Sequence, residues 1–170
     1  DQPLILETDE AFNTFEKIKI SDLLVLNVDS DHLDYFKNLD NYKDAFYKVM
    51  KNVTDNLVIN NDDLNIKSMK ELKNPVSYGK DIAADFKVQS PGTFIYENNK
   101  YEIKSDIIGD HFKANMLGAI ILALLNGIEI KDSLNAIESF AGVKRRIELI
   151  GISKGVLIYD DYGHHPTEME

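Results

Sequence analysis

Asp22-Leu23-Leu24-Val25-Leu26-Asn27-Val28 is the stretch of sequence that decides the fold class. Its apolar residues run together without the alternation of a half-exposed strand, and the run has the length of one strand. Continuous apolar strands are typical of parallel sheets, because helices cover both faces of such sheets. Polar residues follow directly, at Asp29, Asp31 and His32. We therefore predict a buried parallel strand with a polar carboxyl end.

The segment upstream repeats this pattern over a shorter length. Leu4-Ile5-Leu6 is followed at once by acidic residues, the first of which is Glu7. We interpret residues 4–6 as a second buried strand, a neighbour of the first in a parallel sheet. Ligands of open α/β sheets collect at the carboxyl ends of strands. Glu7 and His32 are therefore expected to lie close together.

The segment downstream completes a strand, helix, strand unit. Asp40 is a suitable N-cap for a helix, and residues 56–60 have the pattern of another short strand. Between them, apolar residues recur at helical spacing: Tyr42, Phe46, Val49, Met50 and Val53.

Residues 87–105 have a different character, that of a small antiparallel hairpin. Phe94 and Tyr96 face Tyr101 and Ile103 across the pair Asn98-Asn99. Asparagine tolerates the positive φ angles of a tight hairpin turn. We predict an antiparallel flap that interrupts the parallel sheet.

The clearest helix begins after Gly109 and ends at Asn126-Gly127, a typical C-terminal cap. One stripe of this helix is apolar, and His111 and Asn115 share a face that is turned away from it. Gly118-Ala119 lie beside them and leave room for something to approach closely. The stripe consists of Leu117, Ile120, Ile121, Leu124 and Leu125.

A second helix is predicted at about residues 131–139, and a strand at residues 155–159. The complete pattern predicts an α/β fold, with a mostly parallel sheet flanked by helices and a small antiparallel β flap.

Composition and charge exclude several classes of protein. The 170 residues carry a net charge of −10, which repels a nucleic-acid backbone. No apolar run approaches the roughly 20 residues that a membrane span requires. The chain has no cysteine and no basic segment followed by an apolar one near its start, so nothing indicates secretion. We expect a cytoplasmic protein of about one domain, with no nucleic-acid or membrane partner.

Glu7 and His32 are candidate ligands for one divalent cation. Magnesium prefers oxygen ligands, so one imidazole is tolerable but atypical. The alternative is an ordinary strand-end glutamate and an ordinary loop histidine. The run of residues 29–34 also resembles a calcium loop, but the glycine and the closing glutamate of such a loop are absent.

Two further clusters lie near the end of the chain. Arg145-Arg146 is suited to phosphate or to a ribose-bearing ligand, with a solvated basic pair as the alternative. Asp160-Asp161, followed by His164-His165, suits a metal, a ribose hydroxyl or proton transfer. A polar interdomain hinge is the alternative for this second cluster.

The order and spacing of these clusters resemble the Mur ligases of peptidoglycan synthesis, over nearly the whole chain. The most specific motif is the stretch of residues 160–168, Asp-Asp-Tyr-Gly-His-His-Pro-Thr-Glu, whose Tyr162-Gly163 resembles the alanine-adding members. The other matching motifs are Glu7-Thr8-Asp9-Glu10, Asn27 with Asp31-His32, Gly109-x-His111 with Asn115, and Gly142 with Arg145-Arg146.

The resemblance implies a site, cofactors and partners. Glu7 and His32 would be Mg²⁺ ligands near the ATP phosphates, and Asn115, on the helix of His111, would contact adenine. Arg146 and Asp160 would contact the ribose side of the nucleotide. His164 would lie near the incoming amino acid. His164 and Arg146 are the expected catalytic residues. The intact enzyme would join L-alanine to UDP-N-acetylmuramate through an acyl phosphate, and the oligomeric state stays open.

Some features depart from the family. Phe112 and Ala11 stand where a polar asparagine and a serine are usual, and no Gly-x-x-x-x-Gly-Lys-Ser/Thr phosphate loop occurs in the 170 residues. We therefore interpret residues 1–160 as a partial middle domain without its phosphate loop, and residues 161–170 as a hinge and the start of a further domain. The isolated chain is predicted to be inactive. Two alternatives remain, a ligase that recycles murein tripeptide and a non-catalytic nucleotide-binding module.

Overall fold

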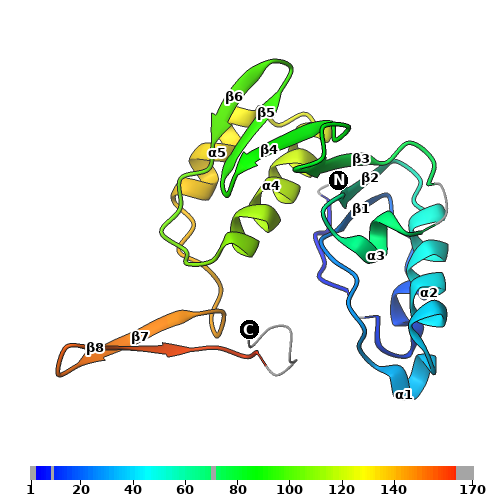
Figure 1. Cartoon of the computed structure of the whole chain (residues 1–170), viewed down its shortest axis with the longest axis horizontal. Coiled ribbons are helices and arrows are strands. Elements are labelled where there is room, and N and C mark those ends of the chain that lie inside the picture. The colour runs from blue at the N-terminus through cyan, green and yellow to red at the C-terminus, as the bar shows by residue number, and fades with distance from the viewer. Residues whose placement is uncertain (1–2, 9, 70–71, 164–170) are drawn as a thin grey trace.

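The fold is that of a computed structural model, which describes residues 3–8, 10–69 and 72–163. Six strands form one sheet in the order β1-β2-β3-β4-β5-β6, and two more form a separate hairpin (Figure 1). The first four strands pair in parallel, and the last two continue the sheet in antiparallel pairing. The predicted α/β class, a mostly parallel sheet with an antiparallel flap, is confirmed. The six strands are β1 (Asp22–Val25), β2 (Asn56–Asn60), β3 (Val76–Gly79), β4 (Phe86–Ser90), β5 (Thr93–Tyr96) and β6 (Asn99–Glu102).

One face of the parallel strands is covered by helix α2 (Leu39–Lys51) and by the 3-10 helix η1 (Ala11–Lys17). The other face carries α4 (Asp110–Leu125) and α5 (Ile130–Glu138), as Figure 1 shows. Successive residues of a strand point to opposite faces. Accordingly Leu57 and Ile59 of β2 pack in the α2 core, while Val58 between them packs in the α4 core. β2 is therefore buried on both faces, as a continuous apolar strand predicts. The two short helices are α1 (Leu33–Phe36) and α3 (Leu64–Lys67).

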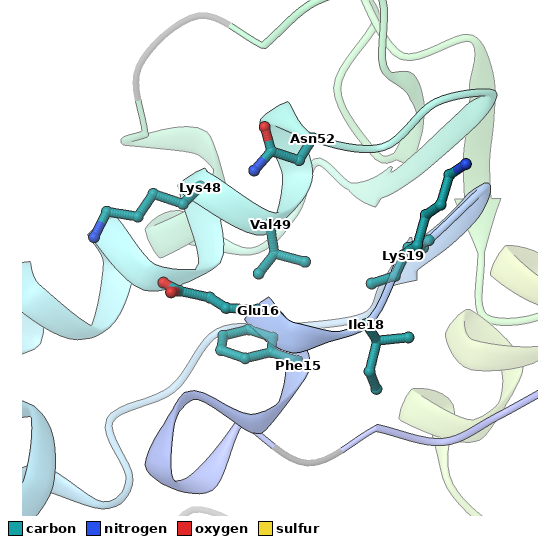
Figure 2. A pocket seen from close by; sticks show the side chains of 8 residues that line it. Phe15, Glu16, Ile18, Lys19, Lys48, Val49 and Asn52 are labelled. Atoms are coloured by element: carbon teal, nitrogen blue, oxygen red, sulfur yellow. The ribbon is translucent and has the colours of Figure 1, made fainter.

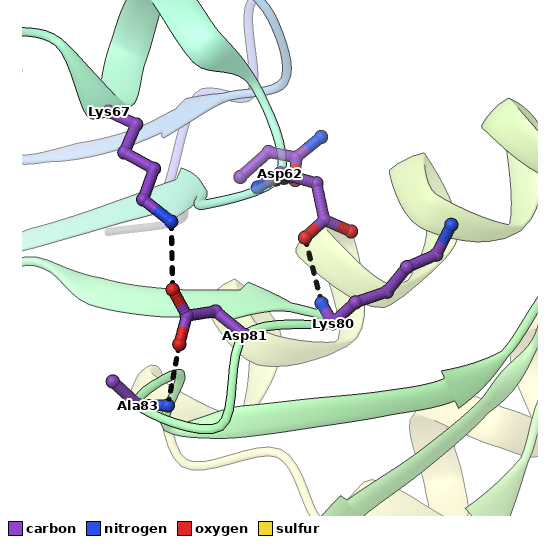
Figure 3. Close-up of polar contacts among 6 residues, drawn as sticks. Asp62, Lys67, Lys80, Asp81 and Ala83 are labelled. Atoms are coloured by element: carbon purple, nitrogen blue, oxygen red, sulfur yellow. Dashed lines mark hydrogen bonds and ion pairs between the residues drawn. The ribbon is translucent and has the colours of Figure 1, made fainter.

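Polar contacts stabilise the short connection between β3 and β4. Parallel strands normally need a long crossover. Here the connection is short, and only Tyr78 and Gly79, the last two residues of β3, pair with β4. In this connection Asp81 accepts hydrogen bonds from the Lys67 ammonium at 2.8 Å and from the Ala83 amide at 3.0 Å (Figure 3). The β3–β4 connection is therefore held by the Lys67 side chain of α3 as well as by the sheet.

Two predicted helices are present, and their ends show the expected types of capping residue. The predicted helix after Asp40 is present, but its N-cap is Asn38, whose side chain accepts a hydrogen bond from the Asn41 amide at 2.8 Å. The predicted helix after Gly109 is also present, and Gly127 follows its end with a φ of 84°, as a C-terminal cap requires. The second predicted helix is confirmed as α5.

The flap differs from its prediction in two details. Phe94 does face Tyr101, but the turn residues with positive φ are Glu97 and Asn98, one position earlier than Asn98-Asn99. The flap extends the sheet at its edge and does not interrupt it. A turn of this kind accepts a glutamate because the flanking strand pairs, and not the turn residues alone, set its register.

The prediction of a strand at residues 4–6 is wrong. These residues belong to no strand, and the exposed fractions of Leu4 and Ile5 are 86% and 93%. A run of three residues makes few ladder hydrogen bonds, and these do not offset the conformational entropy of ordering it. β1 is consequently an edge strand of the six-stranded sheet.

The predicted room beside Gly118 is filled by the sheet itself. A Cβ atom at Gly118 would lie 2.8 Å from Leu24 Cδ1 and 3.1 Å from the Tyr78 hydroxyl. The glycine therefore lets α4 approach β1 and β3 closely. The close approach is a packing contact, and it leaves no space for a ligand there.

The strand predicted at residues 155–159 is β8 (Val156–Asp160), and its partner β7 (Glu148–Ser153) was not predicted. The two strands form an antiparallel hairpin that stands away from the main sheet (Figure 1). The part of the chain that the structure describes contains no helix with the length and apolar character needed to cross a membrane.

Candidate functional site

The first polar group consists of Glu10, Asp31 and His32, and it is called the acidic group below. One ligand atom from each side chain lies within 4.8 Å of the others. His32 Nε2 is 3.8 Å from a carboxylate oxygen of Glu10 and 3.8 Å from one of Asp31, and all three side chains are partly exposed. Two carboxylates and an imidazole at this spacing have the donor set of a divalent cation site.

Local backbone structure positions the acidic group. Glu10 precedes η1, while Asp31 and His32 lie in the loop between β1 and α1. His32 has a left-handed φ of 51°, and its amide donates to the Asp31 carboxylate at 2.6 Å. The Tyr42 hydroxyl, from α2, donates to Glu10 at 3.0 Å. These contacts bring a loop, a helix start and α2 to one place.

The electrostatic field at the acidic group is negative. Burial raises the pKa of Tyr42 far above its ordinary value, and the charges of Glu10, Asp31 and Asp29 raise it further. Each of these carboxylates disfavours another anion nearby. The same field favours a cation.

His32 therefore lies where a metal site was expected, but with carboxylates other than Glu7 beside it. Glu7 is exposed on the segment before η1 and is not a member of the acidic group. The sequence identified both polar clusters but not which carboxylates approach His32. Direct ligation by Glu7 stays a prediction.

The second polar group lies at the base of the β7–β8 hairpin. Arg145 Nε is 3.8 Å from an Asp160 carboxylate oxygen, and its guanidinium lies 4.7 Å from the centre of the Tyr162 ring. The Tyr162 amide donates to the Arg145 carbonyl at 2.8 Å. Arg145 thus joins the chain entering the hairpin to the chain leaving it. The sequence indicated this basic pair but not the role of its first member.

Asp161 links the hairpin base to α4. Its carboxylate accepts hydrogen bonds from the Gly163 amide at 2.6 Å and the Ile147 amide at 2.7 Å. These bonds, and the nearby charges of Arg146 and His111, hold the pKa of Asp161 below its ordinary value. Asp161 is therefore an ionised carboxylate close to both side chains.

His111 and Asn115 lie one helical turn apart in the first half of α4. The imidazole of His111 is exposed, and its ring centre is 4.3 Å from that of Phe112. Gly109, with a φ of 119°, permits this placement, since a Cβ there would lie 2.7 Å from His111 Cε1. The charges of His111 and Arg146 both act on Asp161, and Asp160 lies beside Arg145. His164 lies outside the described residues.

A pocket of about 310 Å³ lies elsewhere, between η1 and the end of α2 (Figure 2). Phe15 and Val49 form its apolar floor, and Lys19, Lys48 and Asn52 lie at its rim. It contains none of the residues predicted to bind nucleotide or metal. The candidate sites are therefore open polar groups and not this pocket.

Comparison with known proteins assigns the chain to a family. The family model described as Mur ligase middle domain matches residues 9–123, which is more than half of the chain. The chain belongs to the Mur ligase family. The resemblance read from the sequence motifs is thereby confirmed, and so is the middle-domain character of the fold.

Individual Mur ligases cover nearly all of the chain. The UDP-N-acetylmuramate–L-alanine ligase of Dictyoglomus turgidum is 35% identical to it over 98% of the chain and 39% of the ligase. The Clostridium botulinum ligase of the same name is 38% identical over 86% of the chain and 35% of the ligase. The crystal structure of the Thermotoga maritima UDP-N-acetylmuramate–alanine ligase superposes with a TM-score of 0.71 at 25% identity, over 90% of the chain and 37% of that structure. The chain thus spans less than half the length of these Mur ligases.

Proposed function

We propose that this chain is the nucleotide- and metal-binding part of a Mur ligase that uses ATP to join L-alanine to UDP-N-acetylmuramate. The observation that carries the proposal is the 35% identity to the Dictyoglomus turgidum ligase over 98% of the chain. Tyr162-Gly163 at the hairpin base supports the alanine-adding branch. An ATP-dependent ligase of soluble precursors is in turn a cytoplasmic enzyme.

The hairpin base and α4 supply the chemistry for a nucleotide. His111 and Asn115 are proposed to contact the adenine, and Arg146 and Asp160 the ribose side. A guanidinium carries fixed donors for phosphate or ribose oxygens, and carboxylates accept from ribose hydroxyls. Because Asp161 is ionised and near His111, this group offers both signs of charge to a ligand.

The acidic group supplies the chemistry for Mg²⁺. His32 and Glu7 are the proposed ligands, with Glu10 and Asp31 as carboxylates that lie close to His32. When bound there, the ion would offset the charge of the ATP phosphates. The chain has a net charge of −10, so an anionic nucleotide needs this compensation.

The proposed reaction has two steps. The muramate carboxylate attacks the γ-phosphorus of ATP, which releases ADP and leaves an acyl phosphate. The amine of alanine then attacks the acyl carbon, and phosphate leaves as the amide forms. Arg146 would neutralise phosphate charge, and His164 would lie near the incoming amine. Catalysis of this kind consists mainly of positioning and charge neutralisation.

A chimeric enzyme tests the proposal. This chain would replace the corresponding segment of the Dictyoglomus turgidum ligase, whose remaining segments are kept. We expect release of ADP that depends on both UDP-N-acetylmuramate and L-alanine. A matched Arg146→Ala chimera should fold and lose most of this turnover.

Two outcomes would contradict the proposal. A folded chimera that releases no ADP would show that the chain is not an interchangeable ligase segment. A chimera that accepts murein tripeptide in preference to L-alanine would assign the chain to the recycling ligases.

A further inference from the structure

Arg145 contacts both strands of the β7–β8 hairpin at their base. Its amide donates to a Glu148 carboxylate oxygen at 2.8 Å, and its Nε lies 3.8 Å from a carboxylate oxygen of Asp160. Glu148 begins β7 and Asp160 ends β8, and the two residues are direct partners in the ladder. Like charges directly opposite each other destabilise a strand pair. Arg145 therefore offsets a repulsion between the two strand ends.

Arg145 also holds the chain that leaves β8. Its guanidinium lies 4.7 Å from the centre of the Tyr162 ring, within the range of a cation–π contact, and the Tyr162 amide donates to the Arg145 carbonyl at 2.8 Å. A planar guanidinium can stack on a ring and present N–H donors to a carboxylate. One residue thus contacts both Asp160 and the residue two positions beyond it.

The backbone around Arg145 has a conformation that needs support. The φ of Arg145 is 60° and that of Ile147 is 49°, in the left-handed region that non-glycine residues seldom adopt. Such conformations persist only where the surrounding contacts hold them. The contacts of Arg145 with the two strand ends, and the bond from the Ile147 amide to Asp161 at 2.7 Å, are of this kind. The turn before β7 therefore keeps Arg145 in one place.

Arg146 has different neighbours from Arg145. Its charge acts on Asp161, together with that of His111 from α4. Arg146 is also half-buried, whereas the side chain of Arg145 is 60% exposed. The first arginine contacts the strand ends, and the second acts on the residues that join the hairpin base to α4.

We propose that the tandem arginines have separate roles: Arg145 is a positioning residue that orients Asp160 and fixes the exit from β8, and Arg146 is the arginine that contacts the nucleotide. The inference rests on the proposed nucleotide site and adds a residue that acts through Asp160. A carboxylate has two oxygens, so Asp160 can accept from a ribose hydroxyl with the oxygen that does not face Arg145.

The first test measures positioning without a nucleotide. Hydrogen exchange of the Tyr162 amide in the 170-residue chain is followed by NMR, because this amide donates to the Arg145 carbonyl. Arg145→Ala should speed the exchange about tenfold or more, and Arg145→Lys, which keeps the charge but not the planar fork, should speed it less. Lys144→Ala removes a neighbouring charge and should change the rate less than about threefold. An unchanged rate in Arg145→Ala, or an equal effect of Lys144→Ala, would overturn the inference.

The second test measures the orientation of Asp160 by the binding of ADP and of 2′,3′-dideoxy-ADP, with isothermal titration calorimetry and Mg²⁺ present. We expect the unmodified chain to bind ADP about tenfold more tightly, the effect of one charge-assisted hydrogen bond, and Arg145→Ala to reduce this preference to about threefold or less. An Arg145→Ala variant that keeps the full preference, or an unmodified chain without one, would overturn the inference and leave the nucleotide site standing. If neither nucleotide binds to the unmodified chain, the nucleotide site itself is wrong, and the role of Arg145 in it is overturned as well.

Discussion

At the scale of single residues, the structure contains two kinds of buried hydroxyl, one with a hydrogen-bond partner and one without a partner among the described residues. The hydroxyls of Tyr42 and Tyr78 make this contrast, since both side chains are at least 97% buried. Tyr42 donates to Glu10, whereas the Tyr78 hydroxyl has no hydrogen-bond partner among the residues that the structure describes. A buried hydroxyl without a partner carries its desolvation cost uncompensated.

Tyr78→Phe is therefore expected to be neutral or to stabilise the fold by up to about 1 kcal/mol. Tyr42→Phe is the matched control, and it should destabilise the fold by about 1 kcal/mol because it removes the bond to Glu10. Urea unfolding of the two variants measures both changes. A large loss of stability in Tyr78→Phe would mean that its hydroxyl has a partner, such as an ordered water.

Glu7 and Glu10 are alternative carboxylates for the proposed cation site at His32. We expect the chain to bind Mn²⁺, as a probe for Mg²⁺, and His32→Ala and Glu10→Gln to weaken this binding about tenfold or more, because each removes a donor from the acidic group. Glu7→Gln tests the proposed ligation by Glu7 directly: weaker binding makes Glu7 a ligand as well. Electron paramagnetic resonance of free Mn²⁺ gives the affinities. Equal affinity in all three variants would place the cation elsewhere.

Asp161 is expected to titrate below the ordinary aspartate value of 3.8, because two amides and the charges near it favour the carboxylate. Its folded-state pKa is depressed, so its contribution to stability is present above pH 3.8 and is lost as the pH falls through the lower folded value. The amide signals of Ile147 and Gly163 should move with this titration in NMR spectra. A midpoint at or above 3.8 would contradict the two hydrogen bonds.

At the scale of elements, the β7–β8 hairpin is distinguished by apolar side chains that are largely exposed. Cross-strand partners lie on the same face, so Leu149 with Tyr159 and Ile152 with Leu157 form one apolar face. Between 39% and 67% of each of these four side chains is exposed. The hairpin is therefore held mainly by its own ladder and by the contacts at its base.

Substitutions on that face are expected to change stability little. Leu157→Ala should cost less than about 1 kcal/mol, because its side chain is half exposed. Leu117→Ala, on the buried face of α4, should cost about 2 to 5 kcal/mol through the cavity that it leaves. Urea unfolding of both variants tests the contrast. Similar losses would mean that the hairpin face is covered in solution.

At the scale of the whole molecule, the two polar groups lie at different parts of the fold. The acidic group joins η1, α1 and α2, and the second polar group joins α4 to the hairpin base. The 170 residues contain no Gly-x-x-x-x-Gly-Lys-Ser/Thr sequence. Nothing in this sequence therefore supplies the backbone amides and lysine that hold β- and γ-phosphates in such loops.

The isolated chain is accordingly expected not to turn over ATP. ADP release would be measured with UDP-N-acetylmuramate and L-alanine, in a preparation free of host ligase. The chimera described above is the positive control. Turnover by the isolated chain above the background of the reagents would refute this expectation.

The sequence alone determined the elements whose signal is local. Residues 56–60 form a strand and the segment after Gly109 a helix, because apolar periodicity and a terminal glycine act within a few residues. The motifs also determined the family, since residue types at fixed spacing carry its chemistry. The tertiary structure decided what depends on distant partners: that residues 4–6 remain unpaired, that Gly118 serves packing against Leu24, and that Glu10 and Asp31 stand beside His32. A strand pairing, a close helix approach and a ligand set each need groups from separate segments, and only the packed chain sets their distances.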